Sequence, residues 1–185
     1  KSVVNTIALQ DGLSACFSPM PLTAEGGNGL HINVSIKSAG EKADTDAFMA
    51  GVLTHAREIS AFLNPTEESY RRLGEKKAPR YVTWSSENRS QLIRIPAARD
   101  EYVRFELRSP DPTANPYLAY ALLIYAGLDG IRNGTPLPPP LDVNLYTADE
   151  AVTSGLSTLP ASLEEAQELA RESRLIRQYL PDILD

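Results

Sequence analysis

Three charged residues alternate with apolar ones in the segment RFELRSPDP, where Arg104, Glu106 and Arg108 lie two positions apart. Successive side chains of a strand point to opposite faces, so this spacing predicts a strand with all three charges on one face. Two guanidinium groups beside a carboxylate suit recognition of an anion next to a cation, because arginine presents a planar fork of donors that matches carboxylate and phosphate. A solvated outer face is the alternative interpretation of this strand.

A histidine follows a glycine-rich turn in the segment GGNGLHINVSI, residues 26–36. Apolar and polar residues alternate after the turn, which predicts a strand within 29–36 whose polar face carries His31, Asn33 and Ser35. The Asn-Gly pair in the turn favours a tight connection. Taken alone, the segment is therefore interpreted as a hairpin with a solvated polar face.

The elements that position these residues are predicted from hydrophobic periodicity. Helices and strands are mixed without the strand–helix–strand rhythm of a parallel sheet, so the sequence indicates an α+β fold. The helix at 116–131 is almost wholly apolar, which is unusual for the surface of a lone domain. The predicted strands are 13–17, 29–36, 81–85, 91–97 and 102–108, and the predicted helices are one that stops at Gly12, 46–63, 66–73, 116–131 and a final pair that begins with a capping box of Ser162 and Glu165.

The composition limits the function classes. The chain has 185 residues, enough for one domain with its own core. Its net charge of −6 and isoelectric point near 5.0 give no support to general nucleic-acid binding. Cys16 is the single cysteine, so no disulfide forms within the chain and a metal site would use histidine and carboxylates. No run is long enough to span a bilayer. Lys1 opens no signal-peptide pattern, so we expect a cytoplasmic protein of which this chain could be a piece.

Five segments occur in the order and approximate spacing found in glutamine synthetase, and the chain resembles the C-terminal catalytic part of the bacterial type I enzyme from Gly12 to Pro181. They are GNGLHINVS, HAREISAFLNPTEESYRRL, WSSENRSQLIRIP, FELRSPDPTANPYLAYALLIYAGLDGI and NLYTADEA. The resemblance implies a curved, mainly antiparallel sheet with the helices near 46–63 and 115–132 on its outer face. It also implies that residues 1–185 lack the family's N-terminal β-grasp domain and a strand with two further metal-binding glutamates.

The resemblance implies a role for each charged residue. The implied metal ligands for Mg²⁺ or Mn²⁺ are His31 and Glu106; the implied glutamate-binding residues are Gly27, Arg72 and Arg108; the implied nucleotide-binding residues are Ser35, Arg89, Arg94 and Arg104; and the implied catalytic residues are Arg89 and Arg108. The implied activity is that of an ATP-dependent glutamate–ammonia ligase, in which ATP phosphorylates the side-chain carboxylate of glutamate and ammonia displaces the phosphate. Positioned cations suit this chemistry because charge builds on the oxygens of the transferring phosphoryl group.

Four positions depart from the family pattern. The loop GEKKAP is one residue shorter than usual and carries Lys77 where a glutamate normally deprotonates ammonium, and Glu75 is out of register. Asn33 replaces a frequent second histidine, and Glu101 replaces a basic ATP-binding residue. Tyr146 aligns with a tyrosine that some type I enzymes adenylylate, but it lacks the usual Asp-Leu-Pro and is interpreted as a packing residue.

These departures leave alternatives open. One is a ligase of the same family that joins glutamate to a polyamine or another amine, and another is a catalytically inactive assembly or binding module. The family enzyme forms a homododecamer, and we expect residues 1–185 alone neither to build that ring nor to catalyse the reaction. His55 is interpreted as a packing or capped histidine, because the pattern places no carboxylate beside it.

Overall fold

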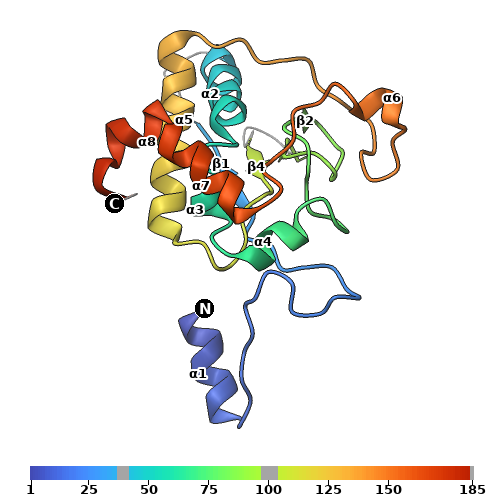
Figure 1. The fold of residues 1–185 in the computed structure, drawn as a ribbon, viewed down its shortest axis with the longest axis vertical. Coiled ribbons are helices and arrows are strands. Elements are labelled where there is room, and N and C mark those ends of the chain that lie inside the picture. The colour runs from blue at the N-terminus through green and yellow to red at the C-terminus, as the bar shows by residue number, and fades with distance from the viewer. Residues whose placement is uncertain (37–41, 97–103, 184–185) are drawn as a thin grey trace.

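The computed structural model describes residues 1–36, 42–96 and 104–183 and shows helices packed against a short four-stranded sheet (Figure 1). The α+β class is confirmed. The strands are β1 (Ile32–Val34), β2 (Trp84–Ser85), β3 (Ile93–Arg94) and β4 (Phe105–Leu107), in the order β1-β4-β3-β2. Strand β4 pairs antiparallel with both β1 and β3, whereas β2 and β3 run parallel, so the sheet is mainly antiparallel as expected.

The predicted strand at 13–17 is wrong, and so is the hairpin interpretation of the glycine-rich segment. Residues 13–17 form no ladder with another described strand, although their apolar pattern suits one. Strand β1 pairs instead with β4, which lies about seventy residues further along the chain. The glycine-rich turn is held by the preceding segment. Asn28 donates from its backbone nitrogen to the carbonyl of Pro19 and from its side-chain amide to the carbonyl of Ser18.

The other predicted strands exist but are shorter than expected. Tyr81 forms only an isolated bridge with Thr158, and the ladder of β2 starts at Trp84. Residues 97 and 102–103, at the ends of two predicted strands, lie outside the described residues, as does Glu101.

Side-chain caps begin several helices, and the cap predicted at Ser162 is among them. Thr66 and Ser69 form a reciprocal capping box, Asn115 accepts from the backbone nitrogen of Tyr117, and Ser162 accepts from that of Glu165. The carboxylate of Glu165 accepts from the nitrogen of Ala161. The helices are α1 (Ser2–Gln10), α2 (Lys42–His55), α3 (Ser60–Leu63), α4 (Glu67–Arg72), α5 (Pro116–Asn133), α6 (Glu150–Thr153), α7 (Leu163–Glu172), α8 (Arg174–Tyr179) and the 3₁₀ turn η1 (Pro181–Ile183).

The single helix predicted at 46–63 is wrong, because the chain breaks between α2 and α3. Helix α2 runs along α5, whereas α3 packs against α7 (Figure 1). One straight helix could not present its apolar stripe to both partners. The turn at 56–59 redirects the chain, so that Ile59 and Leu63 stay buried.

The core lies between α2, α5 and one face of the sheet. Phe105 and Leu107 of β4 point into it, and the rings of Phe105 and Phe48 lie 5.9 Å apart. Helices α2 and α5 approach closely through glycines. A Cβ at Gly51 would collide with the carbonyl of Ala126 and lie 2.7 Å from the nitrogen of Gly130. The other face of α5 is exposed at Tyr117, Tyr120 and Ile124, so this apolar helix is only half buried.

Helix α1 projects from the body beside the N-terminus (Figure 1), and none of its residues is buried. Its exposed side chains include Val3 and Leu9, each 71% accessible. Among the residues that the structure describes, no helix combines the length and apolar character needed to cross a membrane.

His55 ends α2 between two carboxylates, so the argument that it has no carboxylate neighbour is wrong. Its Nδ1 lies 3.2 Å from Glu58 Oε2, and its Nε2 lies 3.0 Å from Asp129 Oδ2 on α5. The hydrogen bond to Glu58 is the main cause that raises the pKa of His55; burial opposes it and Asp129 adds to it. Burial favours protonation of Glu58, but bonds from His55 and Ser173 outweigh it and lower the pKa of that carboxyl. This cluster joins α2, α5 and the start of α8.

We expect Gly51→Ala to destabilise the fold. Alanine favours a helix over glycine by about 1 kcal/mol, but the added methyl group would press on backbone atoms of α5, which costs about 1–3 kcal/mol or more in a packed core. Urea denaturation should therefore show a net loss of stability. Gly155→Ala is the control, because a Cβ at Gly155 meets nothing within 4 Å. Equal stability of the two variants would contradict this account of the helix contact.

We expect the His55 cluster to make stability depend on pH. A raised pKa means that its stabilisation is complete below the ordinary histidine value and is lost as pH rises through the folded-state value. The lowered pKa of Glu58 acts oppositely and is lost only in acid. His55→Gln should remove about 1 kcal/mol at mildly acidic pH and less above neutrality. Chemical denaturation across about pH 5.5 to 8.5 measures this. An unchanged pH profile in the variant would disprove the role of His55.

Candidate active site

A cavity of about 410 Å³ opens on the face of the sheet opposite the core. It brings together residues from the glycine-rich turn, the end of α4, the loop after α4, and strands β3 and β4. The lining residues are Gly27, Gly29, His31, Arg72, Lys76, Lys77, Ala78, Arg89, Arg94, Glu106 and Arg108. Among the described residues, six arginine or lysine side chains and one carboxylate therefore surround it. The positive excess makes the cavity suited to anions.

The sheet register places the charged residues in a row. Glu106 of β4 lies opposite Asn33 of β1 and opposite Arg94 of β3, while its neighbours Phe105 and Leu107 face the core. The period-two alternation thus separates the charges from the apolar side chains, as the sequence predicted. Because Glu106 and Arg108 are buried, at 6% and 4% accessible, the alternative of a simple solvated face is wrong for this part of the strand.

Glu106 is the centre of the cluster. Its Oε1 lies 2.8 Å from Nδ1 of His31, and its Oε2 lies 2.8 Å from Arg94 Nη2 and 3.1 Å from Arg108 Nη1. Only 8% of the side chain is accessible. Burial by itself would raise the pKa of Glu106, but the neighbouring Arg108, His31 and Arg94 together outweigh it and hold the pKa below its ordinary value. The carboxylate is therefore ionised, and the three hydrogen bonds that it accepts favour this charged form.

His31 has the properties of an uncharged imidazole that could bind a metal ion. Burial, followed by the charge of Arg108, lowers the pKa of His31 in spite of the opposing effect of Glu106. A neutral ring that donates from Nδ1 to Glu106 leaves a lone pair on Nε2. That nitrogen lies toward Gly29, where an added Cβ would be 3.2 Å away.

Arg108 holds the walls of the cavity together. Besides its bond to Glu106, it donates from Nε to the carbonyl of Arg89 at 3.1 Å and from Nη2 to the carbonyl of Lys77 at 3.3 Å. A guanidinium has five N–H donors, so two remain for a ligand. Arg94 also keeps a donor, since its buried Nε has no partner among the described residues.

Arg72, at the end of α4, is 2% accessible and supports the same region from behind. Its Nη1 donates to the carbonyl of Ser109 at 2.7 Å, and its Nη2 lies 3.4 Å from the carbonyl of Arg108. Burial is the main cause that lowers the pKa of Arg72. Gly27 fits against this side chain, because a Cβ there would collide with the carbonyl of Pro19 and lie 2.9 Å from Arg72 Cγ.

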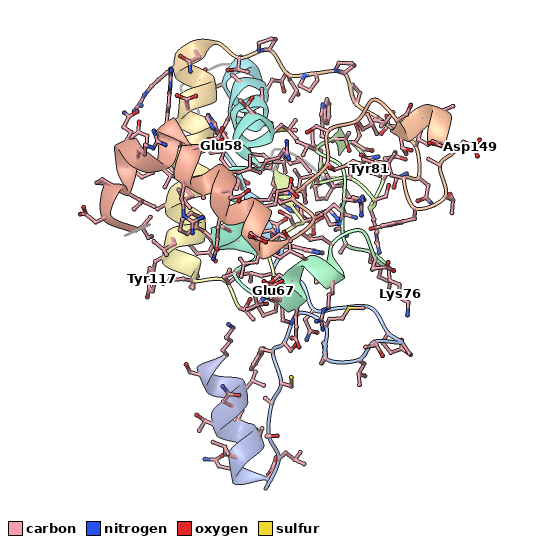
Figure 2. The ribbon with its side chains drawn as sticks, viewed as in Figure 1. Glu58, Glu67, Lys76, Tyr81, Tyr117 and Asp149 are labelled. Atoms are coloured by element: carbon pink, nitrogen blue, oxygen red, sulfur yellow. The ribbon has the colours of Figure 1, made fainter. Side chains whose placement is uncertain are left out.

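Lys76 is a lining residue that the sequence analysis did not single out. It belongs to the loop after α4, and Figure 2 shows it at the edge of the molecule beside that helix. Lys76 and Lys77 both have positive φ angles, of 25° and 79°. This backbone conformation is unfavourable for residues with a Cβ, so the surrounding contacts must hold it.

Two residues with an implied nucleotide role lie outside this cavity. Ser35 lines a shallower neighbouring hollow that also contains His31, Asn33 and Tyr120. Arg104 donates from Nε to Asn33 Oδ1 at 3.1 Å. Their roles stay predictions, and the hollow that contains Ser35 meets the main cavity at His31.

The fit to a divalent cation is partial. A neutral imidazole and an ionised carboxylate are suitable ligand types. The described residues contain no group of three or more histidine, cysteine, aspartate or glutamate side chains placed to hold a metal. His31 and Glu106 would therefore supply only part of a coordination sphere.

The comparisons with known proteins agree with the resemblance. The family model of the glutamine synthetase catalytic domain matches residues 1–184. A glutamine synthetase of Staphylococcus aureus (strain MW2) is 42% identical over 195 residues, and one of Clostridium saccharobutylicum is 40% identical over 197. These alignments cover 97% and 98% of this chain but 44% of each relative, so the chain spans less than half the length of these relatives.

Solved structures agree as well. One described as "GmaS/ADP complex-Conformation 1" superposes with a TM-score of 0.85 at 32% identity, over 96% of this chain and 44% of that one. "Apo GmaS without ligand" gives a TM-score of 0.84 at 32% identity, over 96% of this chain and 43% of that one. By sequence and by structure, the chain belongs to the glutamine synthetase family.

Proposed function

We propose that this chain is the catalytic part of an ATP-dependent ligase that joins the side-chain carboxylate of glutamate to ammonia. The observation that carries the proposal is the buried carboxylate of Glu106, held by His31, Arg94 and Arg108 in a cavity rich in cations. Two anionic substrates must meet in such a reaction. A cavity with six cationic side chains offsets their repulsion.

The proposed reaction has two steps. An oxygen of the glutamate side chain attacks the terminal phosphorus of ATP, and ADP leaves with the electrons of the broken P–O bond. Ammonia then attacks the carbonyl carbon of γ-glutamyl phosphate, and phosphate leaves to give glutamine. Charge spreads over the phosphoryl oxygens in the first step, so donors fixed beforehand lower its barrier.

The residues of the cavity take the following proposed roles. Arg89 and Arg94 neutralise the transferring phosphoryl group, and the buried free donor of Arg94 supports that role. Arg72 and Arg108 bind glutamate, with Gly27 letting the backbone come close. The proposed nucleotide contacts outside the cavity are Ser35 and Arg104.

His31 and Glu106 would hold a divalent cation, Mg²⁺ or Mn²⁺, through Nε2 and a carboxylate oxygen. A bound cation would offset charge on the phosphates of ATP. His31 stays oriented for this by its bond to Glu106, and Arg94 and Arg108 keep Glu106 ionised.

A second candidate is a glutamate–amine ligase of the same family. The loop GEKKAP places Lys76 and Lys77, and no free carboxylate, at the edge of the main cavity in the described structure. A lysine does not attract ammonium. The similar solved structures carry the name GmaS, not glutamine synthetase, which gives this candidate further support.

The rest of the proposed protein would lie outside these residues. The curated relatives extend over more than twice the aligned length. We propose that a β-grasp domain and two further metal-binding glutamates precede this part, and that the full-length protein is a cytoplasmic homododecamer. Residues 1–185 alone would not form that ring.

We expect Arg89→Ala to slow turnover of the full-length protein by about 10²-fold, with a smaller effect on the KM for glutamate, because the lost charge matters most as the phosphoryl group transfers. Glutamate-dependent ADP release measures this. Arg71→Ala is the matched control, since Arg71 is an exposed arginine of α4 that does not line the cavity. Equal rates for the two variants would remove Arg89 from the proposed machinery.

We expect residues 1–185 alone to show no steady ADP release with glutamate, ammonium and Mg²⁺ or Mn²⁺, because two protein ligands hold a cation weakly. Steady release that disappears in Glu106→Ala would show that this part is a complete enzyme. In the full-length protein, the same variant should bind Mn²⁺ more weakly. Absence of glutamate-dependent ADP release from the full-length protein would favour the inactive module.

A further inference from the structure

A second cavity, of about 760 Å³, adjoins the first. Lys76 and Lys77 line both, so the loop that carries them is the wall between the two spaces. The lining residues of the second cavity are Glu25, Gly26, Gly74, Glu75, Lys76, Lys77, Arg80, Tyr81, Ser90, Leu145 and Tyr146. Figure 2 shows Lys76 and Tyr81 on the same side of the molecule.

The loop that carries Lys76 and Lys77 is held by hydrogen bonds to residues that line the first cavity. The carbonyl of Lys77 accepts from Arg108 Nη2 at 3.3 Å, and the backbone nitrogen of Glu75 donates to the carbonyl of Arg72 at 3.1 Å. The amino group of Lys76 donates to the carbonyl of Ala24, next to the lining residue Glu25. These bonds help to hold both lysines at their positive φ angles. A ligand in the second cavity would lie against a wall that is bonded to two arginines of the first.

The two cavities are also connected through the backbone carbonyl group of Arg89. The oxygen of Arg89 accepts from Tyr146 Oη at 3.3 Å and from Arg108 Nε at 3.1 Å. Tyr146 lines the second cavity and Arg108 lines the first. The two spaces therefore share supporting bonds on both the loop side and the strand side.

The charges of the second cavity have both signs. Lys76, Lys77 and Arg80 supply cations, and Glu25 and Glu75 supply carboxylates. Within the described part of the chain, none of these five forms an ion pair. The first cavity differs, because its carboxylate is already bound by three partners. The second cavity thus offers charges of both signs that no opposite charge among the described residues neutralises, which suits a ligand that carries both charges.

We propose that the second cavity binds the acceptor of the reaction, and that this acceptor is a zwitterionic amine, an amino group linked to a carboxylate as in an amino acid. The inference rests on the second candidate function, the glutamate–amine ligase, and puts an amino acid in the place of ammonia as the acceptor. Arg80 and the lysines would bind the carboxylate of the acceptor, because guanidinium and ammonium donors match it. Glu25 and Glu75 would bind its ammonium group.

The chemistry balances with such an acceptor. The ammonium group gives up one proton to solvent or a carboxylate to become a free amine, whose nitrogen then attacks the carbonyl carbon of γ-glutamyl phosphate. A C–N bond forms, the C–O bond to phosphate breaks, and phosphate leaves with the electron pair. Loss of a second proton from nitrogen gives a γ-glutamyl amide whose carboxylate stays in the second cavity.

Other acceptors match the charges less well. A polyamine would bring several positive charges beside Lys76, Lys77 and Arg80. Methylamine or ammonium would leave those three cations without a partner. An acceptor with one charge of each sign satisfies both sets of groups.

The test compares acceptors in the full-length protein with ATP and glutamate. The probes are glycine and β-alanine against methylamine and ammonium, with ADP release and the mass of the γ-glutamyl product as readouts. We expect the amino acids to give the higher kcat/KM. Arg80→Gln should lower kcat/KM for glycine relative to that for ammonium by roughly tenfold, as expected for loss of one charge-assisted contact, and Arg80→Lys should restore most of it.

Arg71→Gln is the control, since that exposed arginine lines neither cavity and should leave the ratio unchanged. Preference for ammonium or methylamine, or an unchanged ratio in Arg80→Gln, would overturn the inference and leave the ligase function standing. No glutamate-dependent ADP release with any acceptor would overturn the proposed function itself.

Discussion

The ionised carboxylate of Glu106 is the constraint on which the site depends. A buried carboxylate is costly unless it is paired and hydrogen-bonded, and removal of one partner leaves an uncompensated charge. Glu106 meets this requirement with an imidazole and two guanidinium groups. Those partners come from three different segments. The carboxylate therefore fixes the distance between the glycine-rich turn, β3 and β4, and the cavity takes its shape from that arrangement.

The core residues behind the sheet also help to position Glu106. Phe105 and Leu107 anchor β4 in the core, so that Glu106 between them must face the cavity. Arg72 then supports the end of that strand by bonds to the carbonyls of Arg108 and Ser109. Arg72, which the resemblance assigns to glutamate binding, thus also stabilises the backbone. Its removal would disturb the backbone as well as the charge.

The sequence predicted local patterns well and long-range partners poorly. Alternation in RFELR placed Glu106 and Arg108 on one face, and the capping residue Ser162 marked the start of α7. The strand at 13–17 failed because alternation says nothing about whether a partner strand is available. The break after His55 and its bond to Asp129, 74 residues away, depend on packing between helices. Lys76 carried no periodic or charge signal that set it apart from its neighbour, and its place between the two cavities is seen only in the structure.

The loop at 74–78 is held mainly by its backbone, and this has a consequence for how such proteins can diverge. Arg108 and Arg72 bond to main-chain atoms of Lys77 and Glu75, which any residue at those positions would supply. Side chains in the loop can therefore change through evolution while its backbone keeps the same conformation. New acceptor preferences could arise there by single substitutions, without any loss of the phosphoryl-transfer cavity behind it.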